Sequence, residues 1–237
     1  MRKHCLKNLF LAGFIAFLGT SLSQAAETDK KEYDHLDLVL IIDKSGSMHG
    51  LESDTIGGFN SMLDKQREQD INTDVTTVMF NSQHEIVHSR KNISEVKALT
   101  EKEYRAGGTT ALLDSVGNTI DTVSSYKDVD SKNNKVVVAI ITDGKENASR
   151  EYSKDVVKKL IEKKQEEGWE FVFLGANIDA VTEAGKLGIS SKHAVRYENS
   201  ARGVQSNYNA ISSFAAEAVD SSAEEGAWRK EVVEDKK

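Results

Sequence analysis

The residues whose types and spacing could do chemistry are Asp43, Ser45 and Ser47, which follow an apolar run that ends at Ile42. A carboxylate and two hydroxyls occupy alternate positions, and Gly46 between the hydroxyls allows the backbone to bend sharply. Three roles fit such a stretch: a cap for the following helix, a nucleophile, or one side of a metal site. A cap explains only one of the two serines.

The nucleophile motifs each lack a required residue in this stretch. The G-x-S-x-G elbow fails because Met48 stands at the central position. The phosphate-binding loop G-x-x-x-x-G-K-[ST] fails because Gly46 and Gly50 are too close and no lysine follows. An aspartyl phosphotransferase of the haloacid dehalogenase type needs an aspartate where Ser45 stands. His49 is a candidate base, although an exposed loop histidine is more simply a solvated residue.

A metal site uses all three residues and draws further ligands from later loops. Mg²⁺ prefers about six oxygen ligands in an octahedral array. Thr109 or Thr110 offers an additional hydroxyl after a flexible glycine pair, and Asp143 offers a second carboxylate, directly or through water. The residue types therefore favour a site for a hard divalent cation.

Predicted strands and helices alternate along the chain and must position these residues. The expected strands are 36–42, 75–80, 85–89, 136–141, 169–176 and 193–197, and the expected helices are 51–69, 112–123, 156–168, 180–187 and 202–219. This order predicts a three-layer α/β fold, a doubly wound and mostly parallel sheet with helices on both faces and one antiparallel edge strand. Ligands of such sheets bind at the carboxyl ends of the strands, where Asp43 and Asp143 are expected to meet.

Three motifs in a fixed order carry a resemblance to a known family. DKSGSM (43–48), GGTT (107–110) and ITDG (141–144) resemble the von Willebrand factor A domain and its metal-ion-dependent adhesion site over about residues 37–219. TIGGFN, ITDGKENASREY and GWEFVFLGAN resemble a bacterial and phage branch of that family. The resemblance implies the metal ligands Asp43, Ser45, Ser47, Thr109 and Asp143, with Thr110 replacing Thr109 if the loop register shifts by one.

The same resemblance implies a binding function. Two carboxylates only balance a divalent cation, so Mg²⁺ or Mn²⁺ (Ca²⁺ is a further option) would keep a position for an Asp or Glu carboxylate of a protein partner. No catalytic base is evident, so we expect no enzyme activity. The alternatives are a hydrolase that uses the cation as a Lewis acid and a domain whose metal is purely structural. Asp54 and Asp114 would either orient the ligands or be solvated helix residues. Glu146 and Asn147 would either shape the rim near the metal or, more simply, form a polar turn.

The first 25 residues have the pattern of a secretory signal. Arg2, Lys3 and Lys7 precede an apolar stretch, 9–22, and small residues then surround an expected cleavage point after Ala25. We therefore expect a periplasmic or secreted protein rather than an uncleaved membrane anchor. The only cysteine, Cys5, lies in this segment, so the mature protein would have no disulfide.

The remaining residues predict one soluble domain between two polar ends. The chain has 237 residues, of which 38% are hydrophobic and 29% are charged. Loss of the signal, with three basic and no acidic residues, would change the net charge from −7 to about −10, which argues against nucleic acid and anionic membranes as partners. Residues 26–36 are expected to be a polar lead-in and 220–237 a charged tail that frays, and nothing in the sequence specifies an oligomeric state.

Overall fold

The computed structural model describes residues 33–176, 178–220 and 222–232. The predicted signal and most of the polar lead-in lie outside the described residues. Within the described part, no helix is both long enough and apolar enough to cross a membrane.

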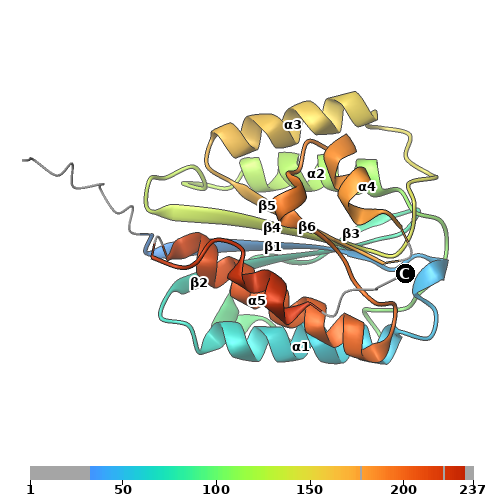
Figure 1. Ribbon diagram of the computed structural model, residues 1–237, viewed down its shortest axis with the longest axis horizontal. Coiled ribbons are helices and arrows are strands. Elements are labelled where there is room, and N and C mark those ends of the chain that lie inside the picture. The colour runs from blue at the N-terminus through green and yellow to red at the C-terminus, as the bar shows by residue number, and fades with distance from the viewer. Residues whose placement is uncertain (1–32, 177, 221, 233–237) are drawn as a thin grey trace, which may run out of the picture. The chain divides into compact units, whose positions relative to one another are not determined.

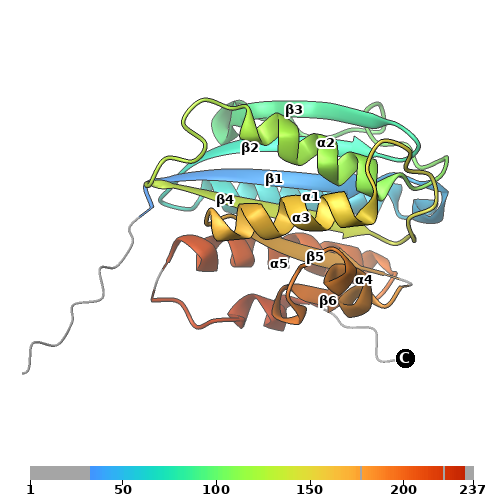
Figure 2. The ribbon, with the colours of Figure 1, turned by 90° about the horizontal axis from the view of Figure 1, so that it is seen from above.

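A six-stranded sheet forms the centre of the domain, in the order β3-β2-β1-β4-β5-β6 (Figure 2). β1 pairs in parallel with β2 and β4, whereas β3 returns antiparallel to β2 at one edge. The strands are β1 (His35–Asp43), β2 (Asn72–Phe80), β3 (His84–Asn92), β4 (Asn134–Thr142), β5 (Glu170–Gly175) and β6 (Ala194–Arg196). The order reverses between β1 and β4, which is the switch point of a doubly wound sheet.

Helices cover both faces of this sheet (Figure 1). α1 (Glu52–Arg67) and α5 (Ala201–Val219) lie on one face, and α2 (Leu112–Ser124), α3 (Lys154–Glu166) and α4 (Ala180–Lys186) lie on the other. The predicted three-layer, mostly parallel fold with one antiparallel edge strand is therefore confirmed.

The apolar run in β1 reflects burial on both of its faces. Leu38 and Leu40 belong to the core beneath α1 and α5, whereas Val39 and Ile41 belong to the core beneath α2 and α3. All four side chains are completely buried. Residues 38–42 are therefore apolar without interruption, and the polar Asp43 stands where the strand ends.

The C-terminal tail is more ordered than its charge predicted. A 3₁₀ helix, η4 (Ala227–Glu231), packs against α5, and Trp228 is only 1% exposed. The Trp228 ring meets Phe214 of α5 edge to face at a centroid distance of 5.3 Å. The prediction of fraying is wrong for residues 222–232, because Trp228 and Val232 join the core and Arg229 donates hydrogen bonds to the backbone of residues 191–194.

Candidate functional site

The two predicted carboxylates lie at the same edge of the sheet. Asp43 is the last residue of β1, and Asp143 directly follows β4. These strands are parallel neighbours with Ile42 opposite Ile141, so their carboxyl ends coincide. Asp43 and Asp143 are buried, at 0% and 2% exposure. The short helix η1 (Gly46–Met48) begins beside them, at the right-hand end of the sheet in Figure 1.

The two serine hydroxyls point to these carboxylates. Ser47 Oγ donates a hydrogen bond to Asp143 Oδ1, and the Oγ atoms of Ser45 and Ser47 lie 3.0 Å apart. The backbone N–H of Ser45 donates to Asp43 Oδ1 at 2.6 Å. Ser45 precedes η1, but its side chain makes no capping hydrogen bond there. The serines thus serve the carboxylate cluster rather than a helix end.

Thr142 is a member of the cluster that the motif analysis missed. Its side chain is fully buried, and its Oγ1 donates to Asp43 Oδ2 at 2.6 Å. The only sequence signal was a threonine that directly precedes Asp143 at the end of an otherwise apolar strand. This hydrogen bond fixes the orientation of the Asp43 carboxylate.

The structure distinguishes between the two threonines of the glycine loop. Thr109 is exposed, whereas Thr110 is 3% exposed. A Cβ built on Gly144 would lie 2.9 Å from Thr110 Oγ1, 3.3 Å from Ser47 Oγ and 3.6 Å from Asp43 Oδ2. Three oxygens therefore surround one point beside Gly144, and Thr110 rather than Thr109 supplies one of them. Any side chain at position 144 would fill this space.

Burial dominates the electrostatics of the two carboxylates. Removal from water raises the pKa of Asp43 and also that of Asp143, whose pKa the nearby charge of Asp43 raises further. Asp143 Oδ2 is buried without a hydrogen-bond partner in the described part of the chain. No lysine or arginine among the described residues pairs with either carboxylate. Two buried carboxylates with the hydroxyls of Ser45, Ser47 and Thr110 nearby form a donor set suited to a hard divalent cation.

Asp114 holds the loop that follows β4, so it is not simply a solvated helix residue. Its carboxylate accepts three backbone N–H groups at 2.7 to 2.9 Å, from Arg150, Glu151 and Tyr152. Asp54 occupies the corresponding third position of α1 and makes no hydrogen bond to another described side chain or loop. Only Asp114 therefore has a structural role beyond its own helix.

Glu146 and Asn147 connect the same loop to Thr110. Asn147 Oδ1 accepts the N–H of Thr110 at 2.9 Å, and the N–H of Asn147 donates to the Thr110 carbonyl at 3.0 Å. The Glu146 carboxylate accepts backbone N–H groups at 2.8 to 2.9 Å, from Leu113, Ala148 and Ser149. These residues shape the rim by fixing the backbone on both sides of the site.

His49 is turned toward another partner. Its Nδ1 lies 3.1 Å from Glu52 Oε1, and its side chain is 66% exposed. Glu52 also accepts the N–H of Gly50 at 2.7 Å. The imidazole thus belongs to an exposed pair at the start of α1.

A second group of potential metal ligands lies at the opposite end of the strands, where β1 and β2 begin. Atoms of His35, Asp37 and Asp74, at the amino ends of β1 and β2, lie within 4.8 Å of one another. Arg90 already binds Asp37 through Nε and Nη2, at 3.0 and 2.9 Å. Because the Arg90 guanidinium binds Asp37, this triad is more simply a partly buried ion-pair network than a cation site.

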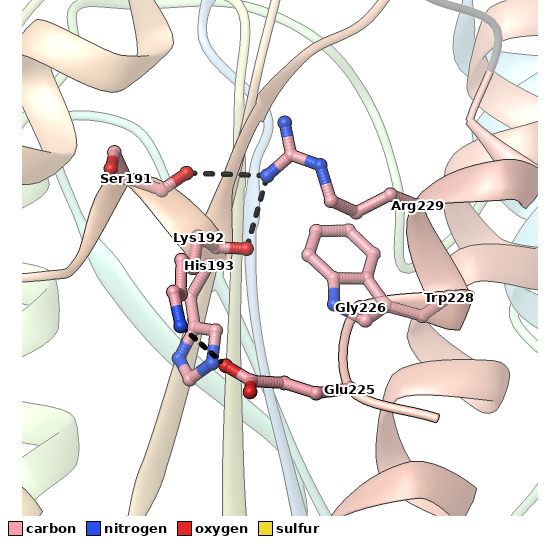
Figure 3. Close-up of a pocket in the computed structure, with 7 residues that line it drawn as sticks. All are labelled: Ser191, Lys192, His193, Glu225, Gly226, Trp228 and Arg229. Carbon is pink, nitrogen blue, oxygen red and sulfur yellow. Dashed lines mark hydrogen bonds and ion pairs between the residues drawn. The ribbon is translucent and has the colours of Figure 1, made fainter. Parts of the chain in front are cut away.

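A pocket of about 460 Å³ lies between the short 3₁₀ helix η3 (Ser191–His193), which precedes β6, and the C-terminal segment that includes η4 (Figure 3). Arg229 Nη1 donates to the carbonyls of Ser191 and Lys192, and Lys192 pairs with Glu225 at 2.8 Å. None of the predicted metal ligands lines this pocket. Its charged groups hold the tail against the edge of the sheet.

The fold is similar to that of several solved structures. Proximal thread matrix protein 1 from the mussel byssus matches with 18% identity and a TM-score of 0.56, over 78% of this chain and 47% of that chain. A structure of the same protein with a zinc-occupied MIDAS motif matches with 17% identity and a TM-score of 0.53, over 77% and 46%. A von Willebrand factor type A structure from Catenulispora acidiphila matches with 13% identity and a TM-score of 0.50, over 79% and 43%.

The chain thus spans less than half the length of these solved proteins, and at such identities the likeness concerns the fold. Comparison with curated proteins finds no match. The von Willebrand factor type A domain, a metal-dependent interaction fold, matches residues 37–210, which is most of the chain. Together with the six-stranded sheet and the cluster at its carboxyl edge, this match shows that the chain belongs to the von Willebrand factor type A domain family.

Proposed function

We propose that this protein is an exported interaction domain whose carboxyl-edge site binds a divalent cation and presents it to a carboxylate of a protein partner. The observation that carries the proposal is the pair of buried carboxylates, Asp43 and Asp143, one of whose oxygens has no partner among the described residues. A buried charge without a counter-charge is costly. A bound cation would remove that cost.

The ligands would be Asp43, Ser45, Ser47, Thr110 and Asp143. Their oxygens suit Mg²⁺ or Mn²⁺, with Ca²⁺ and zinc as further ions to compare. When bound, the cation would supply positive charge at the rim. Ser47 is exposed while Asp43 and Ser45 are buried, so the site opens toward solvent on the Ser47 side, where a partner's Asp or Glu could approach.

We propose binding rather than catalysis because the side chains around the two carboxylates hold them and do not supply a base. Ser47 and Thr142 donate to the carboxylates, and His49 is paired with Glu52. Turnover of a phosphate or carboxylate ester that is lost in Asp43→Asn would contradict this conclusion.

Thermal unfolding with added cations tests the metal site. The purified protein would be unfolded in EDTA and in increasing Mg²⁺, Mn²⁺, Ca²⁺ or Zn²⁺. A cation at 100 times its Kd stabilises the folded state by about 2.7 kcal/mol, which raises the Tm of a domain of this size by roughly 5–10 °C. We expect a saturable rise for the wild type and none for Asp43→Asn.

Asp54→Asn is the matched control, because Asp54 is a partly buried aspartate of the same layer outside the cluster. Its metal response should equal that of the wild type. A wild type that shows no response to any cation, with no heat of binding at millimolar metal, would contradict the proposed site.

Partner binding and export need separate measurements. The metal-loaded protein and its EDTA-treated form would be compared as baits, and Asp and Glu residues of a captured partner replaced by Asn and Gln. Loss of capture on one such replacement, and in EDTA, is the expected result. The N-terminal residue of the protein recovered from outside the cytoplasm would show whether cleavage follows Ala25.

A further inference from the structure

A buried tyrosine lies directly behind the proposed metal site. Tyr104 is 1% exposed, and its hydroxyl donates to the main-chain carbonyl of Asp43 at 2.7 Å. The two residues are 61 positions apart in the chain. The pairing of β1 with β4 ends at Ile42 opposite Ile141, so Asp43 is the first residue of β1 beyond this ladder. The Tyr104 hydroxyl thus binds the backbone where the ligand-bearing loop begins.

Backbone hydrogen bonds continue this contact along the loop. The N–H of Gly107 donates to the Lys44 carbonyl at 2.8 Å, and the N–H of Gly46 donates to the Gly108 carbonyl at 3.0 Å. Residues 104–108 therefore run beside residues 43–46 and hold them in place. Of these three hydrogen bonds, only that of Tyr104 comes from a side chain, so a single substitution can remove it.

A second tyrosine provides a close comparison. Tyr208 of α5 is fully buried in the same core, and its hydroxyl has no hydrogen-bond partner in the described part of the chain. The hydroxyl of Tyr197 shares this condition, and groups of this kind are commonly satisfied by buried water. Tyr104 differs from these residues in that its hydroxyl binds a residue of the proposed site.

We propose that Tyr104 is a positioning residue of the metal site, whose hydroxyl fixes the backbone of Asp43 and so holds the carboxylate and the Ser45–Ser47 hydroxyls in the conformation that binds the cation. This inference rests on the proposed function. Tyr104→Phe keeps the aromatic ring in the core but leaves the buried Asp43 carbonyl without its donor. The loop must then be ordered by the cation itself, which weakens binding.

The test compares Tyr104→Phe with Tyr208→Phe, because both remove one hydroxyl from a buried tyrosine of the same core. Calorimetric titration with Mn²⁺ or Mg²⁺ should give roughly tenfold weaker binding for Tyr104→Phe, as expected for the loss of one hydrogen bond. Tyr208→Phe should bind within about twofold of the wild type. Hydrogen exchange in EDTA should be faster at residues 44–48 in Tyr104→Phe alone.

The outcomes separate this inference from the proposed function. A wild type that binds no cation would contradict the proposed function. A wild type that binds, with Tyr104→Phe binding equally well, would overturn the role of Tyr104 alone. Equal weakening by both tyrosine variants would also overturn it, because the effect would then come from general loosening of the core. Unchanged exchange at residues 44–48 would overturn the positioning step.

Discussion

At the scale of single residues, the site combines side chains that are expensive to bury with neighbours that make burial tolerable. Asp43 accepts hydrogen bonds from Thr142 Oγ1 and from the N–H of Ser45, both at 2.6 Å. Asp143 has one such donor, Ser47, and one oxygen without a partner among the described residues. The asymmetry marks Asp143 as the carboxylate whose environment is least complete without a ligand.

The two adjacent threonines give the sharpest residue-level prediction. Thr110→Val should weaken Mn²⁺ or Mg²⁺ binding roughly tenfold, because it removes an oxygen beside Ser47 and Asp43 at little change in volume. Thr109→Val should leave the affinity unchanged, because the Thr109 side chain is exposed. Metal titrations of both variants check this, and the opposite order would restore Thr109 as the ligand.

Sequence spacing could not decide between these threonines. Gly108 adopts a φ of +82°, so the direction of the next side chains depends on a turn that the motif does not encode. Thr142 was missed for another reason, because a threonine at the end of a strand is ordinary unless its partner across the sheet is known. Asp43 and Asp143 were found because each directly follows a recognisable apolar run, and Ser45 and Ser47 because they stand at alternate positions after Asp43.

His88 should make stability depend on pH. Its ring is 8% exposed and stacks on Phe59, and burial lowers the pKa of its imidazole. The unfolded chain then binds more protons than the folded chain below about pH 6.5, so the free energy of unfolding should fall as the pH falls through that value. Between pH 7.5 and pH 5, the free energy of unfolding of the wild type should fall by more than that of His88→Gln. Urea unfolding of both proteins at the two pH values measures this. A pH-independent difference would contradict this.

At the scale of elements, α2 and the loop after β4 form one unit that carries Thr110. Asp114, in the first turn of α2, binds three backbone N–H groups of this loop, and Asn147 of the loop binds both polar groups of the Thr110 backbone. Hydrogen bonds between elements thus hold this part of the site.

Asp114→Ala should destabilise the protein by roughly 1–3 kcal/mol, because it leaves three backbone N–H groups without their acceptor. Asp54→Ala is the matched control, because Asp54 has the same position in the first turn of α1 without such partners. It should cost less than about 1 kcal/mol, the scale of a helix-dipole interaction. Urea unfolding measures both. Equal losses of unfolding free energy would contradict the stabilising role of the Asp114 hydrogen bonds.

The contact of α1 with α5 depends on one of two consecutive glycines. A Cβ on Gly58 would overlap the ring of Tyr208, whereas a Cβ on Gly57 would meet nothing within 4 Å. Gly58→Ala should therefore destabilise the protein by roughly 1–3 kcal/mol. Gly57→Ala should stabilise it by up to about 1 kcal/mol through helix propensity. Thermal unfolding of the two variants should show Tm shifts of opposite sign, and shifts of the same sign would show that the helices do not pack this closely.

At the scale of the whole molecule, the sequence predicted the sheet and its helices well, because the middle of a strand that is buried on both faces is almost entirely apolar. Residues 38–42 of β1 and 136–141 of β4 show this pattern directly. The order of the tail was not predicted, because only Trp228 and Val232 of this segment belong to the core. Trp228 has charged neighbours in the sequence, so the mean hydropathy of the segment is low although this side chain is buried.

Trp228→Ala should lower the free energy of unfolding by roughly 3–5 kcal/mol, as expected for the loss of a fully buried aromatic side chain. Trp228→Phe should cost less, because it keeps an aromatic ring against Phe214. Thermal unfolding of both variants measures the difference. An alanine variant as stable as the wild type would show that the tail does not belong to the folded domain.

The position of β1 between β2 and β4 also affects the order in which the strand pairings can form. Its pairing with β2 joins residues 37 positions apart, such as His35 and Asn72, but its pairing with β4 joins His35 to Asn134. During synthesis, the side of β1 that pairs with β4 must wait for about a hundred further residues, and such non-local parallel pairing is slow to form. Asp43 and Asp143 approach one another only when that edge closes. A cation that both carboxylates bind can therefore bind only after β1 has paired with β4, the pairing that joins the residues furthest apart in the sequence.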